Sequence, residues 1–95
     1  MSSTNQRIEC RVTGRVQMVM FRDFTRRGAI ALGITGFVRN NEDGSVTVVA
    51  EGEEQRLKAL LGRIAKGSLF SRVDKVETAW SLATGEFGDF TIVIS

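Results

Sequence analysis

Residues 34–52, ITGFVRNNEDGSVTVVAEG, contain two strand-like segments separated by a turn. In the second segment, alternate residues starting at Val46 fall on one face, which is the two-residue period of a half-buried strand. The turn NEDG contains Gly44, and glycine adopts a positive φ without steric cost. The stretch therefore predicts a β-hairpin over residues 34–51.

The same kind of periodicity places elements on both sides of the hairpin. Alternating polar and apolar residues predict strands, and apolar residues recurring at helical spacing predict helices. Gly33 marks the end of the first helix, because glycine suits the left-handed conformation of a C-cap. The expected elements outside the hairpin are a strand from about residue 8 to 13, helices over 21–32 and 57–65, and strands over 73–82 and 90–95.

The order of these elements is β-α-β-β-α-β with one short strand added at the end. Two helices cannot cover both faces of such a sheet, and the alternation within each strand fits helices on one face and water on the other. The sequence therefore predicts an α+β fold, a ferredoxin-like βαββαβ sandwich. In it an antiparallel sheet carries two helices on one face and a short extra terminal strand. We expect one domain over residues 1–95.

The composition excludes several classes of function. The 95 residues carry a formal net charge of +2, which is too small to indicate a nucleic-acid or membrane surface. Histidine is absent and Cys10 is the only cysteine. Ser-His and Cys-His catalysis, a disulfide within the chain and a thiolate metal cluster are thereby excluded. Since no signal peptide or membrane-spanning stretch is recognisable, we expect a cytoplasmic protein. We also expect a monomer that uses no metal or cofactor.

The segment GRVQMVMFRDF, residues 14–24, leads from the first strand into the first helix. Backbone N–H groups at a helix N-terminus carry partial positive charge, so Arg22 is electrostatically unfavourable there unless an anion binds. No Ser, Thr, Asp or Asn stands immediately before Phe21 to cap these groups. A loop entering a helix beside an arginine fits phosphate or carboxylate oxygens. The alternative is that Arg22 extends into solvent.

Asn40 stands at the end of the first strand of the hairpin. In the predicted topology the first and third strands pair and the second flanks the third, so Asn40 lies near the loop after the first strand. Its amide could hold a water molecule through both oxygen and nitrogen, but it could not deprotonate that water. The alternative is a role in the turn, where asparagine is common.

The other charged residues and the cysteine are expected to be structural. Cys10 faces the core, so we prefer a small buried side chain to the alternative of a reactive thiol. Cross-strand ion pairs are the ordinary arrangement on an open sheet face, and the residues that alternate there are Glu9, Arg11, Arg39 and Glu51.

Two segments resemble the signatures of the acylphosphatase family. GRVQMVMFR, residues 14–22, is similar to the family signature GxVQGVxFR, and GFVRN followed by DGSVTVVAEG is similar to the second, shorter signature. The likeness continues through LGITG, EEQRLKALL and SRVDKVE, so it covers essentially the entire chain. Two signatures at the right separation are far more specific than either one alone.

The resemblance implies a cofactor-free hydrolase of small acyl phosphates, with inorganic phosphate or sulfate as a further ligand of the site. It assigns phosphate binding to Arg22 and orientation of the attacking water to Asn40. The anion missing at Arg22 would then be the phosphate of the substrate. The resemblance also implies a phosphate cradle that acts mainly through backbone N–H groups and consists of Gln17, Met18, Val19, Met20 and Phe21.

The chain departs from the family signature within this cradle. The family has glycine where Met18 stands, and often a small residue at the position of Met20. Methionine would be strained at position 18 if a positive φ were required there. A nonenzymatic anion-binding module on the same fold is therefore an alternative function. An RNA-binding sandwich is disfavoured, because RIECRVT and VTVVAEG carry no aromatic residue for stacking on bases.

Overall fold

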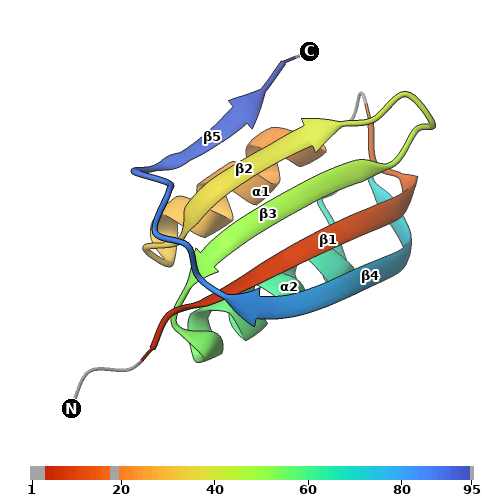
Figure 1. The fold of residues 1–95 in the computed structure, drawn as a ribbon. Coiled ribbons are helices and arrows are strands. Elements are labelled where there is room, and N and C mark those ends of the chain that lie inside the picture. Colours follow the sequence, from red (N-terminus) through yellow and green to blue (C-terminus); the bar gives the residue numbers. More distant parts are fainter. Residues whose placement is uncertain (1–3, 18–19, 95) are drawn as a thin grey trace.

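The computed structural model describes residues 4–17 and 20–94, which form one sheet and two helices (Figure 1). All of the elements expected from the sequence pattern are present. They are β1 (Gln6–Arg15), α1 (Phe21–Ala31), β2 (Thr35–Asn40), β3 (Val46–Gly52), α2 (Glu54–Lys66), β4 (Arg72–Leu82) and β5 (Phe90–Val93).

The sheet has the strand order β4-β1-β3-β2-β5. β1 pairs antiparallel with both β3 and β4, and β2 pairs antiparallel with β3, which confirms the predicted sandwich. One detail of the prediction is corrected: β5 pairs in parallel with β2, so the sheet is mixed rather than antiparallel throughout. The reason is that β4 ends at the end of the sheet where β2 begins, so the chain enters β5 in the same direction as β2.

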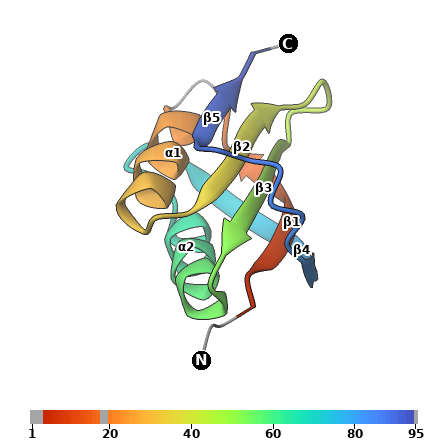
Figure 2. The same cartoon turned by 60° about the vertical axis from the view of Figure 1, so that its left-hand side comes forward.

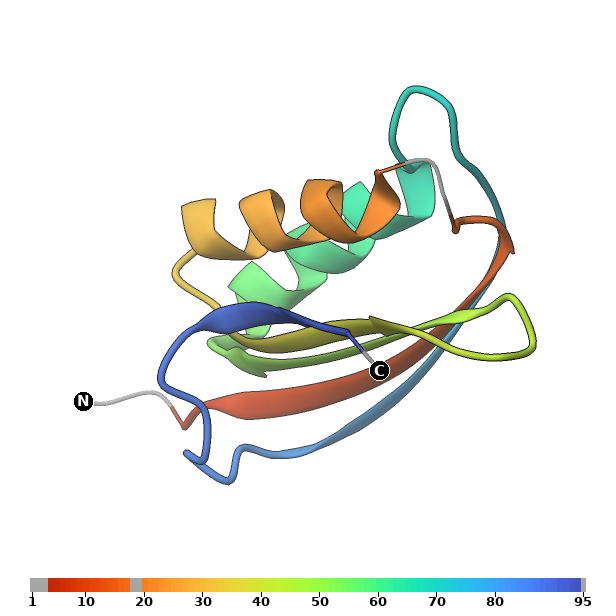
Figure 3. The ribbon, with the colours of Figure 1, turned by 90° about the horizontal axis from the view of Figure 1, so that it is seen from above.

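Both helices cover one face of the sheet (Figure 2, Figure 3). They approach each other at Gly28, where an added Cβ would lie only 2.3 Å from Nε of Arg63. The buried residues of the helices are Phe21, Thr25, Gly28 and Ala29 in α1 and Leu57, Leu60 and Ile64 in α2.

The inner face of the sheet completes the core. Cys10 is 3% exposed there, which confirms its predicted position, and burial raises the pKa of its thiol. The other residues that the central strands contribute to this core are Ile8, Val12, Val38, Val46, Val48 and Ala50. No helix in the described part of the chain is long and apolar enough to cross a membrane.

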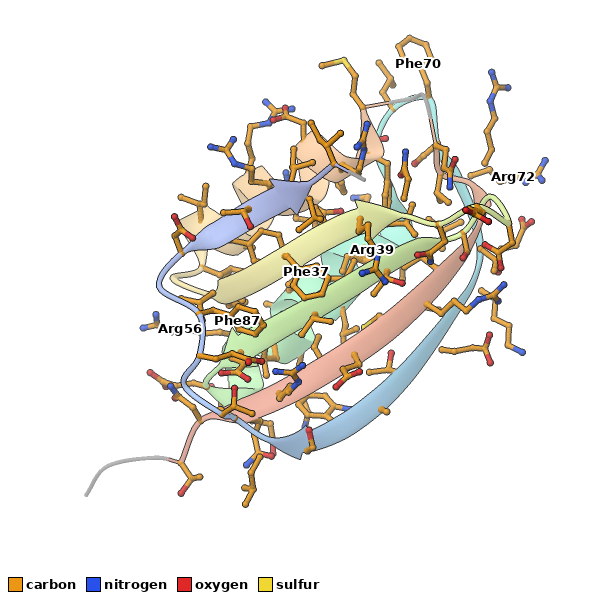
Figure 4. The ribbon with its side chains drawn as sticks, turned by 45° about the horizontal axis from the view of Figure 1, so that its top comes forward. Phe37, Arg39, Arg56, Phe70, Arg72 and Phe87 are labelled. Atoms are coloured by element: carbon orange, nitrogen blue, oxygen red, sulfur yellow. The ribbon has the colours of Figure 1, made fainter. Side chains whose placement is uncertain are left out.

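The outer face of the sheet is covered at one end by residues 83–89, which connect β4 to β5 (Figure 4). Phe87 of this connection and Phe37 of β2 lie together, with ring centroids 5.9 Å apart. Beneath the connection, Glu51 is only 4% exposed. It accepts hydrogen bonds from the backbone N–H groups of Thr84 and Gly85, each 3.0 Å long. This contact fastens the connection to the sheet.

The predicted ion pairs on the outer face are largely present. Glu51 pairs with Arg7 at 3.0 Å, and Arg7 also pairs with Glu9 at 3.0 Å. Arg39 differs from the prediction, because its guanidinium lies 5.7 Å from the ring centroid of Phe37 and pairs with no carboxylate among the described residues. Arg11 pairs with Asp43 and with Glu77.

Candidate active site

The segment after β1, the start of α1 and the end of β2 meet at one end of the molecule (Figure 1, Figure 3). The register of the sheet explains this meeting. Val46 of β3 pairs with Val12 of β1 on one side and with Asn40 of β2 on the other. Asn40 therefore lies level with Val12, close to the end of β1 and two strand spacings or about 10 Å from it across the sheet. The expected neighbourhood of Asn40 and the loop is confirmed.

The side chain of Gln17 ties this loop to the hairpin. Its Nε2 donates hydrogen bonds to the carbonyl oxygens of Asn41 and Ser45, each 2.8 Å long. The resemblance implied a mainly backbone role for Gln17, so this side-chain bridge was missed. The available signal was a lone amide side chain among the apolar residues of the loop. By bridging the two segments, Gln17 fixes the distance between the start of the cradle and the end of β2.

Met20 is the N-cap of α1 and adopts the left-handed conformation, with φ 60° and ψ 21°. Only a small fraction of non-glycine residues adopt such a conformation, and it is strained. Met20 makes no side-chain capping hydrogen bond, and its side chain projects outward with the residue 72% exposed. The sequence raised the question of a positive φ at Met18, which together with Val19 lies outside the described residues. Within the described part of the cradle, the positive φ falls at position 20.

Phe21 begins α1 and anchors it, since it is only 1% exposed. The residues around it leave the first backbone N–H groups of the helix without a side-chain cap. This arrangement agrees with the absence of capping residues in the sequence. The helix start therefore presents partial positive charge to whatever occupies the space in front of it.

Arg22 lines a surface hollow of about 410 Å³ at this helix start. Its guanidinium forms no ion pair within residues 4–17 and 20–94. The nearest acidic residue in the sequence, Asp23, instead pairs with Arg27 at 3.0 Å and with Arg26 at 3.8 Å. Arg22 thus keeps an uncompensated positive charge. The other residues that line the hollow are Val16, Met20, Phe21, Asp23, Ile92 and Ile94.

Asn40 and Asn41 are neighbours with opposite surroundings. The Oδ1 atom of Asn40 is buried and has no hydrogen-bond donor among the described residues. In contrast, Nδ2 of Asn41 donates to Oγ of Ser45 at 2.9 Å and to Oγ1 of Thr47 at 2.8 Å. The turn role that was the alternative for Asn40 therefore belongs to Asn41. A buried amide oxygen without a donor is unusual in a folded protein and calls for an explanation.

The arrangement suits an anion. No group of three or more histidine, cysteine, aspartate or glutamate side chains that could hold a metal occurs in the part of the chain that the structure describes. The hollow brings together the guanidinium of Arg22, which is unpaired among the described residues, and the uncapped helix start. The buried amide oxygen of Asn40 lies at the end of β2 and is not part of the lining of this hollow. Guanidinium and backbone N–H groups bind phosphate oxygens, and an amide oxygen can accept a hydrogen bond from water.

Relatives that are similar in sequence carry the name acylphosphatase. A model of the acylphosphatase family matches residues 8–92. The acylphosphatase of Salinibacter ruber is 44% identical over 91 residues, which cover 96% of this chain and 96% of the relative. That of Caldanaerobacter subterraneus is 45% identical over 85 residues, covering 90% of this chain and 94% of the relative.

The solved structures give the same result. The crystal structure of acylphosphatase from Bacillus subtilis superposes with a TM-score of 0.91 at 34% sequence identity, covering 94% of this chain and 99% of that chain. The similarity thus extends over the whole fold and includes the segments that form the candidate site. The chain belongs to the acylphosphatase family of hydrolases.

Proposed function

We propose that this chain hydrolyses the carboxyl-phosphate bond of acyl phosphates, giving a carboxylate and inorganic phosphate, with Arg22 and Asn40 as its catalytic residues. The observation that carries the proposal is the uncompensated charge of Arg22 beside an uncapped helix start. Such a charge is stabilised by an anion in front of the helix. Because loop, arginine and asparagine all come from one chain, the proposed enzyme is complete as a monomer.

The phosphate is bound by the guanidinium of Arg22 and by backbone N–H groups of the cradle, residues 17–21. A guanidinium presents several donors in a plane that matches phosphate oxygens, and its charge does not depend on pH in the physiological range. Inorganic phosphate and sulfate carry the same oxygens, so both should compete with the substrate. The same contacts become stronger as charge spreads over the phosphoryl oxygens in the transition state.

Asn40 orients the attacking water. Its buried Oδ1 accepts a hydrogen bond from the water, which directs a lone pair of the water oxygen toward phosphorus. The new bond forms between this oxygen and phosphorus while the bond between phosphorus and the acyl oxygen breaks. The carboxylate leaves with the electron pair, and we propose that a phosphoryl oxygen takes the proton of the water.

The leaving group makes this chemistry possible without histidine. A carboxylate is the conjugate base of an acid with a pKa near ~4, so it departs without protonation by a general acid. The protein then has to supply position and charge stabilisation only. An anion-binding module without catalysis is the second candidate, because Met18 replaces the family's glycine. It shares the phosphate site and differs only in turnover.

The test is hydrolysis of benzoyl phosphate by the wild-type chain, Arg22→Ala and Arg26→Ala. Arg26 is the matched control, since it carries the same charge one turn further along α1 and pairs with Asp23. We expect turnover by the wild type and a loss of about 10²–10³-fold in kcat/KM for Arg22→Ala only. Turnover that survives in a folded Arg22→Ala would refute the assignment. Phosphate binding without turnover in the wild type would favour the module.

A further inference from the structure

A second hollow, of about 350 Å³, lies beside the one that contains Arg22. Three of its large apolar side chains belong to strongly exposed residues: Leu69 is 88% exposed, Phe70 72% and Met20 72%. Single exposed apolar residues are ordinary, but a group gathered at one hollow marks a surface that binds something. The other residues that line this hollow are Phe24, Arg27 and Ser68.

The turn between α2 and β4 holds Leu69 and Phe70 outward. The backbone N–H of Ser71 donates to the carbonyl oxygen of Ser68 at 3.1 Å. The hydroxyl of Ser71 accepts from the N–H of Ser68 at 2.7 Å and donates to its carbonyl at 3.0 Å. These three bonds close the turn at its base, so its tip remains in place away from the core. Figure 4 shows Phe70 projecting from this tip, far from Phe37 and Arg39 on the outer sheet face.

Met20 connects the two hollows. It lines the hollow of Arg22 and also the hollow of Leu69 and Phe70. The left-handed backbone at Met20 turns its side chain outward between them. A ligand whose phosphate lies at Arg22 can therefore extend over Met20 onto the apolar turn.

The direction of the reaction selects this side of the site. In phosphoryl transfer the attacking and leaving oxygens lie roughly in line on opposite sides of phosphorus. Asn40, at the end of β2, supplies the water from the side of the sheet. In Figure 3 the start of α1 lies between the β2–β3 hairpin and the connection from α2 to β4. The acyl group, which leaves opposite the water, then points toward residues 68–70.

We propose that Met20, Leu69 and Phe70 form a binding surface for the acyl group, which makes the chain selective for acyl phosphates with an aromatic or large aliphatic acyl group. This inference rests on the proposed function, since it requires phosphate at Arg22 and water at Asn40. The surface contributes uniform binding: burial of the acyl group lowers KM and leaves the chemical step unchanged. Acetyl phosphate has only a methyl group to bury, so this surface adds little to its binding.

The test compares benzoyl phosphate with acetyl phosphate in the double variant Leu69→Ser/Phe70→Ser. We expect kcat/KM for benzoyl phosphate to fall about tenfold through KM, with a change below about twofold for acetyl phosphate. Leu82→Ser is the matched control, because Leu82 is 67% exposed at the far end of β4. Ile94→Ser probes the other apolar wall, since Ile94 lines the hollow of Arg22 and is 84% exposed.

A selective loss for benzoyl phosphate in the double variant alone supports the inference. Equal losses for both substrates, no loss, or a selective loss in Ile94→Ser would overturn it. Calorimetry with phenylphosphonate and methylphosphonate provides a readout that needs no turnover. If the folded wild type hydrolyses neither acyl phosphate, the proposed function fails. The inference then stands only if phenylphosphonate binds more tightly than methylphosphonate and the double variant removes that difference.

Discussion

A buried polar group at one end of the sheet is fully hydrogen-bonded, whereas two polar groups at the other end lack partners among the described residues. At one end the buried carboxylate of Glu51 accepts hydrogen bonds from Arg7, from Gly85 and from both the N–H and the hydroxyl of Thr84. At the other end the guanidinium of Arg22 pairs with no carboxylate of the described residues, and the buried Oδ1 of Asn40 has no donor there. Both ends belong to one sheet and one core, so the contrast is local.

The contrast between hydrogen-bonded and unpartnered polar groups separates the part of the fold that gains stability from the part that we expect to bind a ligand. A buried polar group that is fully hydrogen-bonded holds its neighbours in one arrangement. A buried polar group without a partner costs free energy in the unliganded protein, of order 1–3 kcal/mol. We infer that the second kind persists because substrate and water supply the missing partners. We therefore expect substitutions at the end with Glu51 to lower stability and substitutions at the end with Arg22 and Asn40 to lower activity.

After Arg22→Ala, the largest effect is expected for Asn40→Ala. We expect kcat to fall about 100-fold, because the attacking water loses its acceptor. Inhibition by inorganic phosphate should stay close to normal, since the phosphate is bound elsewhere. The stability in urea should change little, because Oδ1 has no hydrogen-bond donor to lose among the residues that the structure describes. Steady-state kinetics with benzoyl phosphate and equilibrium unfolding measure these quantities.

Asn41→Ala is the matched control for this substitution. Asn41 donates two side-chain hydrogen bonds within the hairpin, so its loss should lower the free energy of unfolding by about 1–2 kcal/mol. Its kcat should remain within a few-fold of the wild type. If Asn40→Ala weakened phosphate inhibition and left kcat intact, the division of roles between Arg22 and Asn40 would be wrong.

Most of the fold could be predicted from the sequence, because buried residues recur with the period of a helix or a strand. The alternation from Val46 gave β3, and the i, i+3, i+4 spacing that includes Leu57 and Leu60 gave α2. The parallel pairing of β5 could not be predicted in the same way. Alternation says which face of a strand is buried, but it does not say which edge the strand joins or in which direction.

The candidate site was predictable only in part. Arg22 was proposed because it is electrostatically unfavourable at a helix start, and Asn40 because the topology places it near the loop. The family signatures include both positions, and the roles of both residues stay predictions. The bridge from Gln17 to the hairpin was missed, because it joins segments that are distant in sequence. The positive φ at Met20 was not predicted, since a side chain alone does not reveal φ, and the question about Met18 stays open because that residue lies outside the described residues. Leu69 and Phe70 gave no signal, because their exposure depends on a turn.

The second prediction concerns Glu51→Gln and its dependence on pH. The amide cannot accept all of the bonds that the carboxylate accepts, so we expect a loss of about 2 kcal/mol at neutral pH. Burial raises the pKa of the Glu51 carboxyl, but the hydrogen bonds from Thr84, Gly85 and Arg7 outweigh it, and the net pKa is lowered. A carboxyl with a lowered folded pKa stabilises the fold above its ordinary pKa of 4.5 and loses that effect as the pH falls through the folded pKa.

The stability difference between wild type and Glu51→Gln should therefore be full above pH 4.5 and shrink at lower pH. Urea unfolding at a series of pH values measures it, and kcat should be unchanged at neutral pH. Glu86→Gln is the control: Glu86 also pairs with Arg7, but its side chain is 54% exposed, so its loss should cost less than about 1 kcal/mol. A difference that grows toward acid would contradict the lowered pKa.

The smallest effect is expected for Met20→Gly. Glycine adopts φ 60° without the steric cost that methionine incurs, but it also gains more freedom in the unfolded chain. The two terms oppose each other, and we expect a net stabilisation of about 0.5–1 kcal/mol in urea unfolding. Met20→Ala keeps a Cβ in the left-handed conformation and should give no such gain. If both variants lowered the free energy of unfolding equally, the side chain of Met20 would be stabilising the helix start by packing. The left-handed backbone at Met20 would then not be a net source of strain.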